Sequence, residues 1–250
     1  MIHIDNPYMD PYFNLAAEEY LFHTSNENIF MLWQNDPVVV IGKHQDAAKE
    51  INKPLAKEKN IRLVRRLTGG GAVYQDQGNF NLTLIGNRHT VANDKLLKAI
   101  RNFLHSLQIS AWIDERKNIC INRFKISGSA QGVYKDRWLY HATLLFSSDL
   151  AILQSILQPD NPFSTISQLI CVESVKSPVT NIRDYLPDYI SIYQFKQRLM
   201  EYMISFFPFS QSYIFTPKDL AAIYYLKENK YATNLWNYRI SSFPYPVASI

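Results

Sequence analysis

Hydrophobic and polar residues are spaced along the chain in a way that predicts both helices and strands. Apolar residues recur at helical intervals at residues 10–24, in part at 46–60, and at 93–107, 149–157, 191–206 and 217–229. The first helix is expected to start at Asp10, followed by Pro11, a pair typical of helix starts. Short apolar or alternating runs predict strands at residues 29–33, 38–41, 61–66, 79–85, 109–113, 118–122, 124–131 and 138–146.

The order of these elements indicates the fold class. Strands occur in runs mixed with helices rather than in regular alternation with them, which favours an α+β fold. A chain of 250 residues suits one large domain or two small ones. We find no repeat and no low-complexity linker, so we expect a single domain over residues 1–250. Its sheet should be mixed and mostly antiparallel, with helices flanking it.

Composition narrows the class of protein. With 47% hydrophobic and 19% charged residues, the chain lies within globular norms, which excludes disorder and collagen. Two cysteines exclude a disulfide scaffold, and no Cys/His spacing resembles a zinc site. We find no signal peptide or membrane-spanning run, so a cytoplasmic protein is expected. A net charge of +4 suits an anionic ligand or acidic partner better than nucleic acid.

A glycine-rich loop is the strongest local signal. A predicted strand ends at Arg66, and after Leu67 and Thr68 come Gly69, Gly70 and Gly71. Glycines allow a close approach of the backbone to a ligand and permit positive φ. Amides of such a loop can cradle a phosphate, and Arg66 can add charge to the same anion. The loop is neither a Walker A nor a dinucleotide motif. From the glycines alone, a flexible hairpin with solvated arginines is equally open.

Three predicted strands carry polar faces. The polar sets are Asn79, Asn81 and Thr83; Lys125, Ser127, Ser129 and Gln131; and His141 with Thr143. Ile126, Gly128 and Ala130 should form the opposite face of the second strand. A solvent-exposed face of an open antiparallel sheet would give the same pattern. We favour a cleft in which Lys125 contacts both a carboxylate and a phosphate, as acyl and adenylyl transfer require.

Three separated stretches together resemble the lipoate–protein ligase family. They are Leu32–Asn35 with Val40–Gln45; Arg65–Tyr74 with Asp76, Gly78, Asn79 and Asn81; and Lys125–Ala130 followed by His141, Thr143, Leu144 and Leu145. Fainter matches at Ser174–Asn181, Lys230–Tyr231 and Trp236–Asn237 extend the resemblance over nearly the whole chain. The resemblance implies the α+β catalytic fold that this family shares with biotin ligases and that is related to class II tRNA synthetases.

The resemblance also implies a two-step reaction. ATP and lipoate, with magnesium, would give lipoyl-AMP and pyrophosphate. The lipoyl group would then pass to a lysine on a lipoyl domain of a 2-oxoacid dehydrogenase E2 subunit or on the glycine-cleavage H protein. Arg66 would hold ATP phosphates, and Lys125 would bridge the lipoyl carbonyl and the α-phosphate. The remaining ligand-binding set would be Gly69, Gly70, Gly71, Ala72, Val73, Tyr74, Asp76, Asn79, Asn81, Ser127, His141 and Thr143.

Several positions depart from the family pattern. Lys117-Asn118 stands where an Asn-Asp pair is usual, so Asn118 would be a weak, neutral magnesium ligand. Gln75 replaces a usual His after the loop, and Ala142 stands where a Gly is common. Many members continue into an accessory domain. We expect that domain to be absent here, and a separate accessory subunit is a further partner to consider.

Two other functions stay open at this point. One is an octanoyl- or lipoyltransferase that needs no ATP and uses a cysteine nucleophile, here Cys171. No base paired to Cys171 is evident, which weighs against it, and Cys120 in an apolar strand is expected to be a buried filler. The other is a non-catalytic binder of lipoate or lipoyl domains, suggested by Asn118, Gln75 and Ala142.

Overall fold

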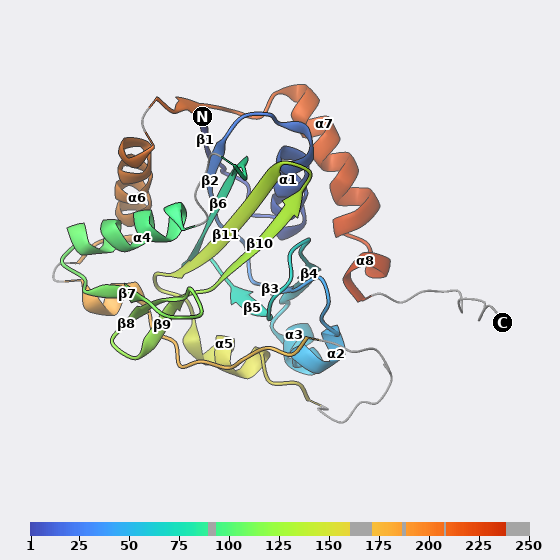
Figure 1. Cartoon of the computed structure of the whole chain (residues 1–250). Coiled ribbons are helices and arrows are strands. Elements are labelled where there is room, and N and C mark those ends of the chain that lie inside the picture. The colour runs from blue at the N-terminus through green and yellow to red at the C-terminus, as the bar shows by residue number, and fades with distance from the viewer. Residues whose placement is uncertain (90–93, 161–171, 187–188, 208, 239–250) are drawn as a thin grey trace.

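A six-stranded mixed sheet forms the centre of the computed structural model (Figure 1). Its strands follow the order β10 Ser129–Tyr134, β11 Arg137–Leu145, β6 Asn79–Asn87, β2 Ile29–Trp33, β1 Ile2–Asp5 and β12 Gln211–Ser212. The pairings from β10 to β2 are antiparallel, and β1 pairs parallel with β2 and β12. The structure describes residues 1–89, 94–160, 172–186, 189–207 and 209–238. The predicted α+β fold with a mostly antiparallel sheet is confirmed.

Two three-stranded sheets lie below the main sheet in Figure 1 and carry the segments with predicted chemistry. One has the order β4 Arg62–Arg65, β3 Val38–Ile41 and β5 Val73–Gln75. The other has the order β7 Ala111–Ile113, β8 Ile119–Ile121 and β9 Phe124–Ser127. The glycine-rich loop connects β4 to β5, and Lys125 lies in β9. The two sheets therefore bring both predicted site segments to the same end of the main sheet.

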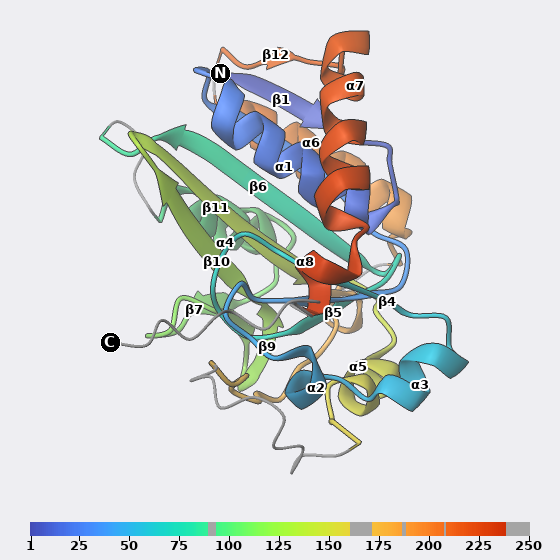
Figure 2. The same ribbon diagram turned by 90° about the vertical axis from the view of Figure 1, so that its right-hand side faces the viewer.

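Helices cover both faces of the main sheet (Figures 1 and 2). α1 Pro11–Thr24 and α7 Pro217–Leu226 lie on one face, and α4 Lys95–Ser106 and α6 Ile192–Phe206 lie on the other. The remaining helical elements are α2 Ala47–Glu50, α3 Lys53–Glu58, α5 Leu150–Ile156, a 3₁₀ turn at Ile182–Tyr185, a π-helical turn at Lys227–Tyr231 and α8 Asn234–Tyr238. Among the described helices, none is long and apolar enough to cross a membrane.

The alternating pattern of β6 explains the two cores. Phe80, Leu82 and Leu84 pack with α4 and α6, whereas Ile85 packs with α1 on the opposite face. The helix start is also as predicted, because the Asp10 carboxylate accepts a hydrogen bond from the amide of Tyr12 at 3.1 Å. Such caps satisfy amides that have no partner within the helix. The sequence pattern thus specifies the layers on which the site is built.

The predicted strand over residues 124–131 is wrong in one respect. The chain leaves one sheet at Ser127 and enters another at Ser129, because β9 pairs with β8 whereas β10 pairs with β11. Gly128 at the break exchanges hydrogen bonds with Thr143, at 2.8 Å to the amide and 3.2 Å to the hydroxyl. The predicted opposite face is therefore disrupted, since Gly128 and Ala130 line the same pocket as Lys125.

Some predicted boundaries differ from the structure. The short strands β1, β5 and β12 were not expected. β5 and β12 have only three and two residues, and the alternation of β1 covers only the four residues Ile2–Asp5. The predicted helix over 217–229 ends at Leu226 and continues as the π-helical turn. The predicted start of another helix at residue 93 lies outside the described residues.

Candidate active site

A pocket with two adjoining lobes lies where the three sheets meet. The first lobe has a volume of about 210 Å³ and the second about 240 Å³. Both lobes share a wall made of Ala72, Val73, Lys125, Gly128, Thr143, Ser174 and Val175. The first lobe reaches Leu15, Trp33 and Val40, and the second reaches Leu145, Leu153 and Leu157. No Asp or Glu is among the described residues that line either lobe, so the pocket suits an anion with apolar parts.

Lys125 stands on the wall common to both lobes. Lys125 lies in β9, and residues 178–180 also hold its backbone: its amide donates to Pro178 O and its carbonyl oxygen accepts from the amide of Thr180, at 2.9 and 3.2 Å. In the described part of the chain, its ammonium has no carboxylate within ion-pair distance. Burial, and then the nearby Arg116 guanidinium, lower the pKa of Lys125 below its ordinary 10.5. A desolvated ammonium without a counterion favours an anionic ligand.

Arg66 lines the first lobe but already has protein partners. Its guanidinium donates to the carbonyl oxygens of Val40, Gly69 and Gly71 at 3.1, 2.6 and 2.8 Å. Its Nε also donates to the hydroxyl of Thr68 at 3.1 Å. Burial lowers the pKa of Arg66 to about 10. Arg66 therefore holds the glycine-rich loop in shape, and its predicted contact with ATP phosphates stays a prediction.

The backbone of the glycine-rich loop comes very close to the β3–α2 connection. Gly70 has a φ of +87°, and a Cβ on Gly42 would lie 2.0 Å from the carbonyl oxygen of Gly70. Only glycine fits at such an approach. The amides of Gly70 and Gly71 have no hydrogen-bond acceptor among the described residues, and both glycines line the first lobe. These amides are therefore available to an anion, as the sequence predicts.

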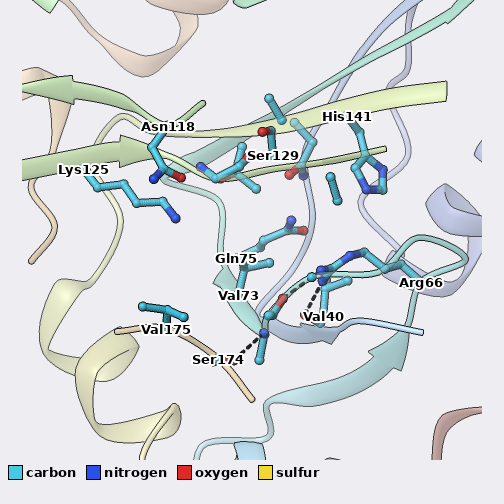
Figure 3. A pocket seen from close by; sticks show the side chains of 18 of the residues that line it. Val40, Arg66, Val73, Gln75, Asn118, Lys125, Ser129, His141, Ser174 and Val175 are labelled. Carbon is cyan, nitrogen blue, oxygen red and sulfur yellow. Dashed lines mark hydrogen bonds between the residues drawn. The ribbon is translucent and has the colours of Figure 1, made fainter. Parts of the chain in front are cut away.

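Ser174 clamps the loop from the opposite side, a role that the sequence analysis missed. Its hydroxyl accepts from the amide of Ala72 at 2.7 Å and donates to the Glu50 carboxylate at 2.5 Å. Gln45 donates to the same hydroxyl at 3.0 Å. Burial raises the pKa of Glu50, although hydrogen bonds from Ser174 oppose this. Figure 3 shows Ser174 and Val175 on one side of the pocket, across from Asn118 and Ser129.

A buried network behind the first lobe was also missed. The Glu18 carboxylate, 3% exposed, accepts from Thr83 Oγ1 at 2.5 Å and lies 3.0 Å from His141 Nδ1. The other nitrogen of His141 is 2.9 Å from the hydroxyl of Thr68, which accepts from Arg66. Trp33 Nε1 donates to Thr83 at 2.8 Å. The network links α1 and the main sheet to the glycine-rich loop.

Most of the predicted site residues lie on the pocket wall. Those lining one or both lobes are Arg66, Gly70, Gly71, Ala72, Val73, Tyr74, Asn81, Lys125, Ser127, His141 and Thr143. Asn81 Nδ2 and Ser127 Oγ are buried without a hydrogen-bond partner among the described residues, which suits contact with a ligand. The sequence placed Ser129 on a polar face of the predicted cleft but gave no ligand contact to Arg116, Trp33 or Leu15; all four line the first lobe.

Three predicted site residues lie outside both linings. The carbonyl oxygen of Gly69 accepts hydrogen bonds from the Arg66 guanidinium. The Asp76 carboxylate accepts from the amides of Gly78 and Asp149, both at 2.9 Å, and so holds a turn. Asn79 donates to Asn81 Oδ1 at 3.1 Å and supports it from behind. These residues contact the protein outside the pocket wall, and their predicted part in ligand binding stays a prediction.

Asn118, the predicted weak magnesium ligand, lines the first lobe. Its amide nitrogen donates to Asp114 Oδ2 at 2.8 Å, which leaves Oδ1 as its available ligand atom. No group of three or more His, Cys, Asp or Glu suited to a metal occurs among the described residues. Magnesium often keeps several waters and binds through one or two protein oxygens plus substrate phosphates. Asn118 Oδ1 fits such a nucleotide-borne ion.

The structure describes only one of the two cysteines, Cys120. Cys120 is buried in β8, and burial raises its thiol pKa, so its thiolate is scarce. This agrees with its expected role as a buried filler. Cys171, the nucleophile of the alternative transferase hypothesis, lies outside the described residues.

The fold and the cationic two-lobed pocket define a catalytic domain suited to an acyl chain joined to a phosphate. The chain belongs to the family described as the lipoyl protein ligase A/B catalytic domain, which matches residues 10–204. The predicted family is thereby confirmed.

Known relatives agree with this membership. "Lipoate–protein ligase 1" of Staphylococcus aureus is 35% identical over 241 residues, covering 94% of this chain and 72% of the relative. A bipartite lipoate protein ligase of Thermoplasma acidophilum, solved in a study with its E2 lipoyl domain, has a TM-score of 0.81 at 26% identity, covering 98% of both chains. A lipoate–protein ligase A structure with bound ATP has a TM-score of 0.79 at 23% identity, covering 95% and 98%, and shows the shared fold. The predicted ligase class agrees with these names.

Proposed function

We propose that this protein activates lipoate with ATP and transfers the lipoyl group to a lysine of a lipoyl domain. The observation that supports this most is the position of Lys125 on the wall shared by two lobes that no described carboxylate lines. A mixed anhydride of a fatty acid and AMP has an apolar arm, a nucleoside arm and a charged centre. The pocket provides two arms and a cation between them.

The first lobe suits the acyl chain. Leu15, Trp33 and Val40 give it an apolar inner end, and the Glu18–His141 network closes it from behind. Figure 3 places His141 and Arg66 at one end of the pocket and Lys125 with Asn118 at the other. A lipoate lying along this lobe would direct its carboxylate toward Lys125. The second lobe, with Tyr74 and Ser127 on its wall, would then take the adenosine.

In the first step a lipoate oxygen attacks the α-phosphorus of ATP, and pyrophosphate leaves with the electron pair of the broken P–O bond. Lys125 pairs with the α-phosphate, where negative charge is concentrated during the transfer. The amides of Gly70 and Gly71 can donate to the same phosphate. Magnesium bound to the triphosphate would offset its charge, with Asn118 Oδ1 as the protein ligand.

In the second step the acceptor lysine amine attacks the acyl carbonyl. The bond from the acyl carbon to the phosphate oxygen breaks, AMP leaves, and the amine loses a proton to solvent. Lys125 stabilises the negative charge that develops on the carbonyl oxygen and on the departing AMP. No side chain of this protein becomes acylated. Lipoyl domains of E2 subunits or of the glycine-cleavage H protein are the proposed acceptors.

Incubation with lipoate, magnesium-ATP and an apo lipoyl domain, followed by intact mass measurement, tests the proposal. We expect a lipoyl mass increase on the acceptor that requires ATP and disappears with Lys125→Ala. A mass increase from an acylated donor protein without ATP, lost in Cys171→Ala, would favour the transferase hypothesis. A protein that binds added lipoyl-AMP but never forms it would be a binder.

A further inference from the structure

A second cation faces the pocket from the turn between β7 and β8. Arg116 lines the first lobe together with Lys125 and Asn118, yet its side chain is largely exposed to solvent. Among the described residues it has neither a hydrogen-bond acceptor nor a carboxylate partner. Arg62 differs, because its guanidinium pairs with Asp10 and Asp36 at 3.0 and 3.1 Å. Arg116 is therefore a cation of the pocket wall that has no counterion in the part of the chain that the structure describes.

The turn that carries Arg116 is well fixed. The Asp114 carboxylate accepts from the backbone amide of Asn118 at 2.7 Å and from its side-chain amide at 2.8 Å. The amide of Lys117, whose φ is +61°, donates to the carbonyl of Asp114 at 2.9 Å. The Asp114 carboxylate is thus occupied by hydrogen bonds within the turn. Arg116 lies at the tip of this β7–β8 hairpin, at the edge of the pocket.

The two cations affect each other. Burial lowers the pKa of Lys125 most, and the charge of Arg116 is the next largest cause. Two like charges at one pocket end repel, and a single phosphate that pairs with Lys125 leaves the second charge uncompensated. A triphosphate or pyrophosphate carries enough charge for both. A guanidinium also binds phosphate oxygens through two parallel hydrogen bonds.

We propose that Arg116 binds the β- and γ-phosphates of ATP and then the pyrophosphate released from them. This rests on the proposed function and assigns its leaving-group site. As the bond between the α-phosphorus and its bridging oxygen breaks, that oxygen gains negative charge, and Arg116 neutralises it. Lys125 stays with the α-phosphate. Because lipoyl-AMP contains one phosphate only, Arg116 has no part in the second step.

Kinetics of the two half-reactions with Arg116→Ala test this assignment. We expect the KM for ATP to rise about 10- to 100-fold, the range for loss of a charge-assisted hydrogen bond. Inhibition by added pyrophosphate should weaken similarly, while the KM for lipoate and transfer from preformed lipoyl-AMP to the lipoyl domain stay unchanged. Arg123→Ala, on the neighbouring β8–β9 turn outside both linings, is the matched control.

An unchanged KM for ATP and unchanged pyrophosphate inhibition would overturn the assignment. Equal slowing of transfer from lipoyl-AMP would also overturn it, because that step contains no β- or γ-phosphate. If the wild-type protein forms no lipoyl-AMP, the proposed function fails instead. Calorimetric titration of pyrophosphate into the wild-type and Arg116→Ala proteins then tests the site alone, with equal affinity as the contrary result.

Discussion

Arg66 and Lys125 face the same pocket but are used in opposite ways. The Arg66 guanidinium donates to the carbonyl oxygens of Gly69 and Gly71 in its own loop, to that of Val40 in β3 and to the hydroxyl of Thr68. Lys125 has no carboxylate partner among the described residues, and burial with a neighbouring cation lowers its pKa. One charge therefore organises the protein, and the other is left for the ligand. A charged residue in a motif is not by itself a ligand contact.

The largest effect should come from Lys125→Ala. Removing one preorganised group that stabilises transition-state charge typically slows an enzyme by about 10²–10³. We expect a loss of this size in lipoyl-AMP formation, measured as ATP-dependent release of pyrophosphate. Lys57→Ala, an exposed lysine on α3, should leave the rate unchanged. A loss below about threefold would remove Lys125 from its proposed role.

Urea unfolding should show the reverse order of effects: substitution of Arg66 should lower the free energy of unfolding more than substitution of Lys125. Arg66→Met leaves the carbonyls of Val40, Gly69 and Gly71 without their donor, and a buried unpaired group costs about 1–3 kcal/mol. The free energy of unfolding should fall by at least that amount. Lys125→Met removes a half-buried charge that has no carboxylate partner among the described residues, so stability should stay equal or rise. Equal losses for both variants would contradict the distinction.

Loop shape can be tested with two glycines. Gly42→Ala places a Cβ 2.0 Å from the carbonyl oxygen of Gly70, so the glycine-rich loop must shift. We expect at least a tenfold fall in kcat/KM for lipoyl-AMP formation, equivalent to about 1.4 kcal/mol. Gly69→Ala is the matched control, because no atom lies within 4 Å of its Cβ. Similar activities of the two variants would show that the close approach is unimportant.

The Glu18 network should have a smaller effect. Glu18→Gln keeps the size of the side chain but offers only one oxygen to Thr83 and His141, where the carboxylate serves both. Replacing a charge-assisted hydrogen bond by a neutral one costs about 1 kcal/mol, a factor of about five. We expect a KM for lipoate raised by roughly this factor at little change in kcat. A changed KM for ATP with an unchanged KM for lipoate would show that the network does not support the lipoate site.

The pH dependence should carry a signature of Lys125. Its pKa lies below the ordinary 10.5 in the free protein, so the ammonium is lost at a lower pH than for a free lysine. The kcat/KM for lipoyl-AMP formation should fall as pH rises through this lowered pKa. In Lys125→Arg, whose guanidinium stays charged, this fall should be absent from whatever activity remains. An identical alkaline limb in both proteins would assign it to another group.

The sequence predicts the layers and most of the pocket wall because both depend on local pattern. The Asp10-Pro11 start and the alternation of Phe80 with Asn81 are read from neighbouring residues. Gly128 was misplaced because a strand that changes sheets keeps its alternating pattern on both sides of the break. Local pattern gives no account of which distant element each half pairs with.

The missed residues share one cause. Glu18 lies on the buried, mostly apolar face of α1, and only the tertiary contacts with Thr83 and His141 explain a carboxylate there. Ser174 acts through Ala72 and Glu50, which are far from it in the chain. The family resemblance marked Ser174 faintly but gave no role. Contacts of this kind follow from the fold and not from spacing.

Affinity for lipoyl-AMP is the most direct test of the central claim, that Lys125 is the cation reserved for the ligand. Calorimetric titration of lipoyl-AMP into wild-type, Lys125→Ala and Lys57→Ala proteins isolates binding from catalysis. Because Lys125→Ala loses a charge-assisted hydrogen bond, its Kd for lipoyl-AMP should rise about 10- to 100-fold. Lys57→Ala should bind like the wild type. Equal affinity in all three proteins would contradict the account.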